Sequence, residues 1–179
     1  MNRKIPVLLV VLSIALTPGA QADERYASDP DDVEGAFDLA SASHGHGNVT
    51  SQLVHSLGTY EPWTNEEFHG AHIRFWLPDG DRAYDRILNV TTNPDDSLTA
   101  AMTSLDAPHT PFRGYANVYR TDETSFEIVM PVRLLARNLR SYRWKAYLFY
   151  DNCPEGAHDE SCSGYDSHEG RVRHVIGSP

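Results

Sequence analysis

Basic residues are scarce in this chain of 179 residues. Its 15 lysines and arginines stand against 25 aspartates and glutamates, which leaves a formal net charge of −10. Phosphate backbones and anionic lipid surfaces repel a chain this acidic, so we expect no nucleic-acid partner. No long block of like charge is present, which is typical of a solvated surface rather than of an interaction tail.

The compact motifs of common enzyme classes are also missing. The sequence contains no Gly-x-Ser-x-Gly turn, no His-Glu-x-x-His pair, no phosphate-binding loop and no dinucleotide-binding glycine pattern. Adjacent carboxylates such as Glu66 and Glu67 would point to opposite faces of a strand. Nothing in the sequence therefore indicates catalysis, and we expect a protein that is not an enzyme.

Long apolar runs are absent after the first residues. Two basic residues precede one apolar run, Ile5 to Leu16, and small residues follow it up to Ala22. This order predicts a secretory signal peptide over residues 1–22. The run is shorter than the roughly 20 residues that a membrane-spanning helix needs. We therefore expect a secreted, extracellular protein without membrane insertion, in which residues 23–179 form one domain.

Cysteine occurs only twice, as Cys153 and Cys162. Export would place both thiols in an oxidising compartment, and an even count predicts a disulfide between them. The short segment that separates them is rich in turn-forming residues, so its ends can meet. We expect this bond to close a loop over residues 151–169. Two thiols alone do not complete a zinc site.

Alternation of apolar and polar residues is the dominant pattern. It is clearest in residues 48–58, 71–77, 124–130 and 141–150, and turn-forming residues separate these segments. The pattern predicts an all-β fold of about eight or nine antiparallel strands. One short helical turn is expected near residues 131–137, started by a proline.

Alternating strands leave each sheet with one apolar face, which has to be covered. We therefore expect two sheets that pack face to face, as a jelly-roll-like antiparallel β-sandwich, with a barrel as the alternative. Phe75, Phe126 and Trp144 fall on the apolar faces of their segments. They are predicted to lie in the core.

The order of several segments resembles a known group of proteins. These segments are DPDDVEGAFDLASAS (29–43), VHSLGTY (54–60), IRFWL (73–77), SYRWKAY (141–147) and YDNCPEG (150–156). They are similar to small secreted bacterial β-sandwich proteins of unknown activity, to carbohydrate-binding-module family nine and to DOMON-like domains. The resemblance implies a jelly-roll-like sandwich that binds a sugar, a haem or a structural calcium ion.

Acidic residues gather before the first expected strand of the sandwich. Asp29, Asp31 and Asp32 lie within four positions, and Asp151 follows a late strand. Calcium takes six to eight oxygen ligands, so these carboxylates could supply part of a calcium site. The alternative is an Asp-Pro turn in which the carboxylates accept hydrogen bonds from nearby backbone N–H groups.

Two histidines, His44 and His46, would share one side of an extended strand. Two imidazoles on one side can start a zinc or copper site, which needs a third ligand such as His55, His69 or His72. The alternative is that both are polar residues at the end of a strand.

Aromatic residues offer candidate platforms for a sugar ring. The candidates are Trp63, Trp76, Tyr115, Tyr119 and Trp144. Trp76 alternates with core residues beside His72 and Arg74, and these three are predicted to form a shallow polar-aromatic ligand-binding patch. The alternative is ordinary cross-strand packing.

Three functions follow from these features. The first is a non-catalytic domain that binds a ligand, with a glycan or cell-wall polymer ahead of other ligands and with a structural calcium ion. The second is a metal-dependent extracellular enzyme or metal carrier that uses His44 and His46. The third is a structural protein of the cell envelope.

Overall fold

The computed structural model describes residues 25–32, 36–47, 51–78, 85–105, 111–151 and 164–172. The predicted signal peptide and the predicted disulfide between Cys153 and Cys162 lie outside these residues. Within them, no helix is long and apolar enough to cross a membrane.

The described chain is all-β, as predicted, with ten strands and one turn of 3-10 helix. The strands are β1 (Arg25–Ser28), β2 (Leu39–His46), β3 (Gln52–Thr59), β4 (Ala71–Trp76), β5 (Arg86–Thr92), β6 (Leu98–Ser104), β7 (Phe112–Arg120), β8 (Ser125–Pro131), β9 (Tyr142–Asp151) and β10 (Gly164–Val172). The helical turn, η1 (Val132–Leu134), follows Pro131 and confirms the predicted position with a shorter extent.

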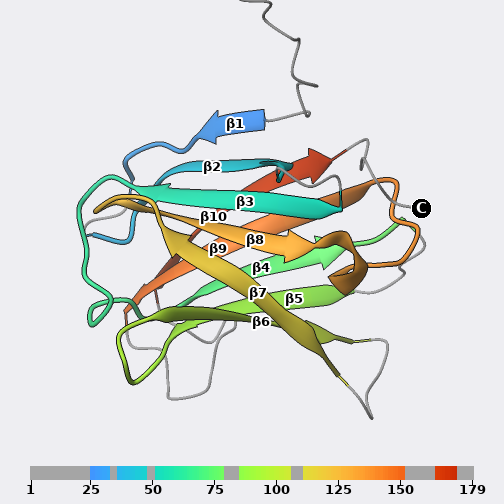
Figure 1. Ribbon diagram of the computed structural model, residues 1–179. Coiled ribbons are helices and arrows are strands. Elements are labelled where there is room, and N and C mark those ends of the chain that lie inside the picture. The colour runs from blue at the N-terminus through green and yellow to red at the C-terminus, as the bar shows by residue number, and fades with distance from the viewer. Residues whose placement is uncertain are drawn as a thin grey trace, which may run out of the picture.

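All ten strands belong to one antiparallel sheet, in the order β1-β2-β3-β8-β7-β6-β5-β4-β9-β10. The sheet is curled, so that its first and last strands lie on the same side of the molecule (Figure 1). The expected sandwich of two separate sheets is not confirmed, because β7 pairs with both β6 and β8. The structure instead has one sheet that folds over its own apolar face.

Strand β7 forms the corner of this sheet. Its residues 112–116 pair with β6, and its residues 117–120 pair with β8. The register shifts next to Met102, opposite Gly114, whose φ of 141° is a conformation that side-chain-bearing residues rarely adopt. Such irregularities bend a strand and increase its local twist. They allow the two halves of the sheet to face each other.

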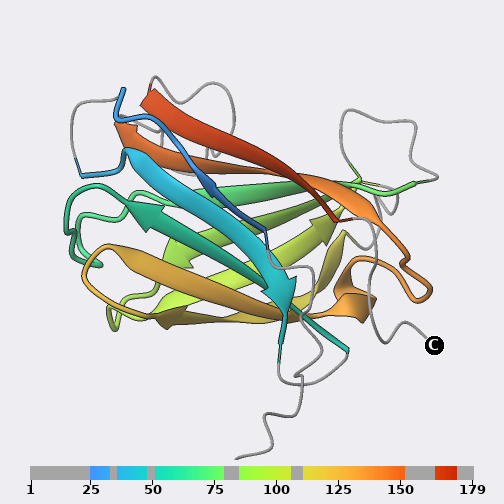
Figure 2. The ribbon, with the colours of Figure 1, turned by 90° about the horizontal axis from the view of Figure 1, so that it is seen from above.

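The two ends of the sheet meet at a seam that side chains hold together. The backbone N–H of Leu39 in β2 donates to Oδ2 of Asp166 in β10 over 2.8 Å. Asp29, just after β1, contacts Nδ1 of His168 in β10 at 2.9 Å. Figure 2 shows β10 beside β1 and β2 along this seam. In the part of the chain that the structure describes, the seam therefore joins the ends without a ladder of backbone hydrogen bonds.

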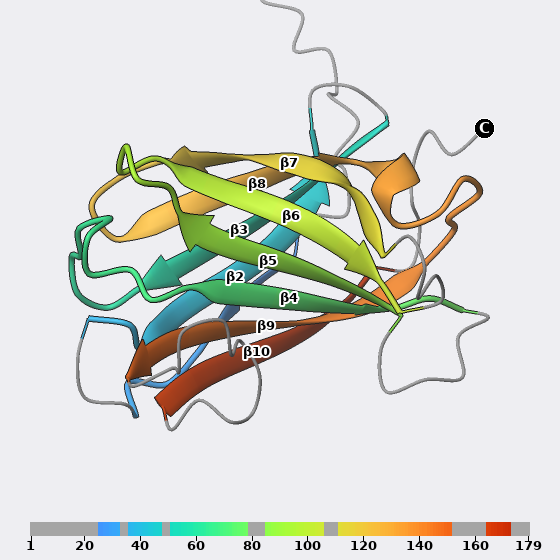
Figure 3. The same ribbon diagram turned by 90° about the horizontal axis from the view of Figure 1, so that it is seen from below.

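The inner faces of both halves share one apolar core. The predicted core residues Phe75, Phe126 and Trp144 are confirmed, since each is at most 2% exposed. Burying an aromatic side chain of this kind contributes roughly 1.5–3 kcal/mol relative to leaving it exposed. Figure 3 shows β4, β5 and β6 in front of β2, β3 and β8, which lie on the other side of this core.

The last strand begins earlier than expected. Residues 164–169, predicted as part of the disulfide loop, belong to β10 and pair with β9. Asp166, Ser167, His168 and Glu169 alternate between the two faces in a segment with few apolar residues. Because this segment is polar, the sequence did not predict it as a strand, although it holds the seam.

Candidate functional site

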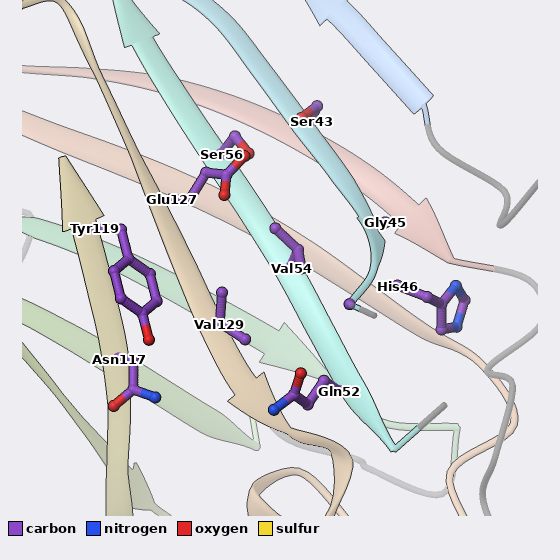
Figure 4. Close-up of a pocket in the computed structure, with 11 residues that line it drawn as sticks. Ser43, Gly45, His46, Gln52, Val54, Ser56, Asn117, Tyr119, Glu127 and Val129 are labelled. Carbon is purple, nitrogen blue, oxygen red and sulfur yellow. The ribbon is translucent and has the colours of Figure 1, made fainter. Parts of the chain in front are cut away.

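A groove of about 400 Å³ lies on the outer face of β2, β3, β8 and β7 (Figure 4). A volume of roughly 300–1,000 Å³ is typical of small-ligand sites. We call this site the outer groove. Its lining residues are Ser43, Gly45, His46, Gly47, Gln52, Val54, Ser56, Asn117, Tyr119, Glu127 and Val129.

Strand register explains how residues distant in sequence meet in the outer groove. Ser43 lies opposite Ser56, Ser56 lies opposite Glu127, and Glu127 lies opposite Tyr119. These four side chains form a row across four strands, as Figure 4 shows. Neighbouring strands are about 4.8 Å apart, so the row spans roughly 14 Å. The row is wide enough for one or two sugar-sized rings.

A second row lies beside the first and forms the floor of the groove. Gly45 lies opposite Val54, Val54 opposite Val129, and Val129 opposite Asn117. Glycine has no side chain and valine has a short one. This row therefore rises less above the sheet than the polar row on one side and Gln52 on the other. The groove is hollow for this reason.

The chemistry of the groove is that of hydrogen bonding to neutral polar groups. Hydroxyls from Ser43, Ser56 and Tyr119 and side-chain amides from Gln52 and Asn117 can each donate and accept hydrogen bonds. Tyr119 is 52% exposed and presents its ring to the solvent. Among the described lining residues Glu127 is the only carboxylate. Most glycosidases use two carboxyl groups across the cleft, and the described lining supplies one.

Exposed aromatic side chains continue from the groove along β7. Tyr115 is 68% exposed and Phe112 52%, and their ring centroids are 5.0 Å apart. Tyr115, Asn117 and Tyr119 alternate with inward residues, so they share the outer face of the strand. This face carries two of the aromatic residues that the sequence suggested as sugar platforms.

The three residues of the predicted patch, His72, Arg74 and Trp76, differ in how far they are buried. All three lie on one face of β4, but His72 is 1% exposed and Arg74 7%. Aromatic side chains from β9 cover them: the ring of Phe149 is 4.8 Å from that of His72, and Arg74 lies 4.5 Å above the ring of Tyr147. Only Trp76 remains partly exposed. An open patch of all three residues is therefore not formed.

The predicted calcium ligands converge only in part. Carboxylate oxygens of Asp29, Asp32 and Asp166 lie within 4.8 Å of one another. Asp31 is exposed and outside this group, and the side chain of Asp151 lies outside the described residues. The sequence pattern missed Asp166, because it belongs to the strand that was predicted as loop.

The three carboxylates fit a cation site incompletely. Asp166 accepts hydrogen bonds from the N–H groups of Leu39 and Ser167, and Asp29 is paired with His168. The three carboxylates carry six oxygens, three of which already have these partners, whereas calcium takes six to eight oxygen ligands. Asp29 and Asp166 hold the seam through these contacts, and calcium binding by the three carboxylates stays a prediction.

His44, which was predicted to form a metal-binding pair with His46, lies in the interior of the sheet beside His55. His44 is 3% exposed, and its Nδ1 accepts a hydrogen bond of 3.3 Å from the indole N–H of Trp144. His55 lies opposite His44, and its Nε2 is 3.0 Å from the hydroxyl of Tyr142. His46, two residues after His44, borders the outer groove. In the described residues, no group of three metal-binding side chains includes either His44 or His46.

Burial controls the protonation of this pair. Burial of the ring, together with a smaller contribution from the neighbouring His44, lowers the pKa of His55 from 6.5 to about 3. Burial also raises the pKa of the Tyr142 hydroxyl well above its ordinary value. Both groups therefore stay neutral at physiological pH, and their hydrogen bond is one between neutral partners.

The comparisons with known proteins assign no family to this chain. No family model matches the sequence. No curated protein and no solved structure matches it either.

The buried His55 predicts a specific dependence of stability on pH. Between about pH 3 and pH 6.5 the unfolded chain binds a proton at this position and the folded chain does not. The free energy of unfolding should therefore rise with pH across this interval. His55→Gln keeps a hydrogen-bonding group near Tyr142 and should flatten this rise, as measured by urea unfolding at several pH values. His69→Gln, at an exposed position, is the control; a His55→Gln slope equal to that of the wild type would contradict the prediction.

The calcium prediction is tested by thermal unfolding of the chain with calcium or with a chelator. Binding to the folded state alone raises the melting temperature, by about 2–4 °C for each kcal/mol in a domain of this size. Asp32→Asn should remove the increase, whereas Asp31→Asn, outside the group, should retain it. Equal melting temperatures with calcium and with chelator would contradict the prediction that this group binds calcium.

Proposed function

We propose that this protein is a secreted, non-catalytic glycan-binding domain and that the outer groove is its binding site. The observation that carries the proposal is the row of Ser43, Ser56, Glu127 and Tyr119 across four strands. It places hydroxyls, a carboxylate and an aromatic ring in one hollow. Sugars present hydroxyl groups at their edges and apolar C–H groups on their ring faces, so they require both kinds of contact.

Tyr119 is the residue on which we expect a sugar ring to stack. Its ring forms one end of the polar row, and it is large, rigid and about half exposed. Aromatic residues of this kind supply contact area at a low entropic cost. Tyr115 and Phe112 extend the same face along β7, which favours a polymer over a single sugar.

The polar side chains would fix the orientation of the sugar. Ser56 and Glu127 lie at the centre of the row, where their oxygens can accept hydrogen bonds from two neighbouring hydroxyls. A carboxylate acceptor forms stronger hydrogen bonds than a neutral one. Neither lysine nor arginine lines the groove among the described residues, so a neutral glycan fits it better than an acidic one.

The alternative of a metal-dependent enzyme or carrier receives less support. His44 points into the core and accepts a hydrogen bond from Trp144, whereas His46 borders the outer groove. Among the described residues, neither histidine belongs to a group of three metal-binding side chains. A metal ion would have to reach the interior of the sheet to use both.

The proposal is tested with a panel of neutral polysaccharides and with the chain that follows the predicted signal peptide. We expect one or more of them to retain the protein, and Tyr119→Ala to weaken that binding about tenfold or more, because a central aromatic contact is lost. Tyr115→Ala removes an exposed tyrosine from the same strand and face, but outside the groove lining, and should weaken the binding of a short oligosaccharide less than twofold.

Two outcomes would contradict the proposal. The first is the absence of retention on every neutral glycan. The second is a Tyr119→Ala variant that binds as tightly as the wild type. Self-association without glycan binding would instead favour the structural envelope protein.

A further inference from the structure

A second row of side chains crosses the outer face at the other half of the sheet. Trp76 in β4 lies opposite Arg143 in β9, and Arg143 lies opposite Arg171 in β10. Both arginines are exposed, and Trp76 is partly exposed. The guanidinium carbon of Arg143 is 5.4 Å from the centre of the indole of Trp76. The row is separate from the outer groove, which lies on β2, β3, β8 and β7.

The surface is hollowed on both sides of this row. One hollow of about 460 Å³ is lined by Trp76, Arg143, Trp144, Glu169, Gly170 and Arg171. A second hollow of about 400 Å³ adjoins it and shares Trp76, Arg143 and Arg171. We call the first hollow the arginine cleft. Gly170 is required in its wall, because a Cβ atom there would lie 2.6 Å from the ring of Trp144.

The charges in the arginine cleft are unbalanced. Like charges directly opposite each other on antiparallel strands are destabilising, and Arg143 and Arg171 are such a pair. The next outward pair along the same strands, Lys145 and Glu169, has opposite charges. Among the described residues, neither guanidinium group forms a hydrogen bond or an ion pair. In a chain with a net charge of −10, this is an unusual concentration of positive charge.

A bound anion would relieve the repulsion between the two arginines. Guanidinium groups bind carboxylate and phosphate oxygens through paired, charge-assisted hydrogen bonds. Glu169 borders the same cleft, so two positive charges and one negative charge leave a net charge of +1. This balance suits a singly charged carboxylate better than a doubly charged phosphate.

Trp76 adds a second requirement for the ligand. Its indole is at one end of the row and offers a flat apolar face beside the arginines. Aromatic faces of this kind pack against the C–H face of a ring. We propose that the arginine cleft binds an acidic sugar, whose carboxylate contacts Arg143 and Arg171 and whose ring packs against Trp76. This site does not depend on the function of the outer groove.

The test uses an oligomer of galacturonic acid, the matching neutral galactose oligomer and inorganic phosphate as probes. In the Tyr119→Ala variant, which lacks the proposed stacking contact of the outer groove, isothermal titration at low ionic strength should detect the acidic oligomer and neither of the other two. Arg143→Gln and Arg171→Gln should each weaken its binding about tenfold or more, because a charge-assisted contact is removed. The affinity should also fall as salt is added.

Lys145→Gln is the matched control, because it removes the same charge from β9 two positions away, outside the cleft lining. It should change the affinity less than twofold, and so should Tyr119→Ala in the outer groove. Both arginines are exposed and repel each other, so their variants should melt at or above the temperature of the wild type. Equal losses in Lys145→Gln and Arg171→Gln, equal binding of the neutral oligomer or phosphate, or no binding of the acidic oligomer would each overturn the proposal.

Discussion

The indole of Trp144 joins the two halves of the sheet at the centre of the molecule. It donates a hydrogen bond to His44 on β2, and its ring packs edge-on against His55 on β3, with centroids 4.9 Å apart. His55 in turn contacts Phe75 and the hydroxyl of Tyr142 on the far half. A single sheet covers its own apolar face only where such contacts keep its two halves together. The fold depends on this group, which combines aromatic packing with two hydrogen bonds between buried side chains.

Both proposed binding sites lie on the outer face of the sheet, because the interior is filled by the core. Inward positions are filled by one core, whereas outward positions of neighbouring strands align in cross-strand rows. The polar row of the outer groove and the row of Trp76, Arg143 and Arg171 are both built in this way. The first has one carboxylate and no arginine, and the second has two arginines. The protein therefore presents two surfaces of different chemistry on one sheet.

Local sequence patterns predicted the strands and the core, because alternation reports directly which side of a strand is buried. Phe75, Phe126 and Trp144 were placed correctly for this reason. The order of strands could not be predicted, because pairs such as β3 with β8 depend on contacts distant in the chain. Without that order, nothing in the sequence brings Ser56, Glu127 and Tyr119 together. Tyr119 alone was suggested beforehand, as an aromatic candidate.

The burial of His72 and Arg74 and the position of Asp166 could not be predicted from the sequence, and both have the same physical cause. Alternation puts His72 and Arg74 on the outer face of β4, but Phe149 and Tyr147 on the adjacent strand cover them. Asp166 was missed because its strand is polar and contains too few apolar residues to show an alternating pattern. In both cases a neighbouring strand, and not the local sequence, determines the environment. The prediction of a single curled sheet would have required the same knowledge.

The contact between Trp144 and His44 tests this account most directly. In a nuclear magnetic resonance spectrum, the indole N–H of Trp144 should show a nuclear Overhauser effect to ring protons of His44 or His55 and should exchange slowly with solvent. The indole nitrogen is 3.3 Å from Nδ1 of His44, and the donating hydrogen is buried. An indole N–H of Trp144 that exchanges rapidly and shows no effect to either histidine would mean that the two halves of the sheet do not meet.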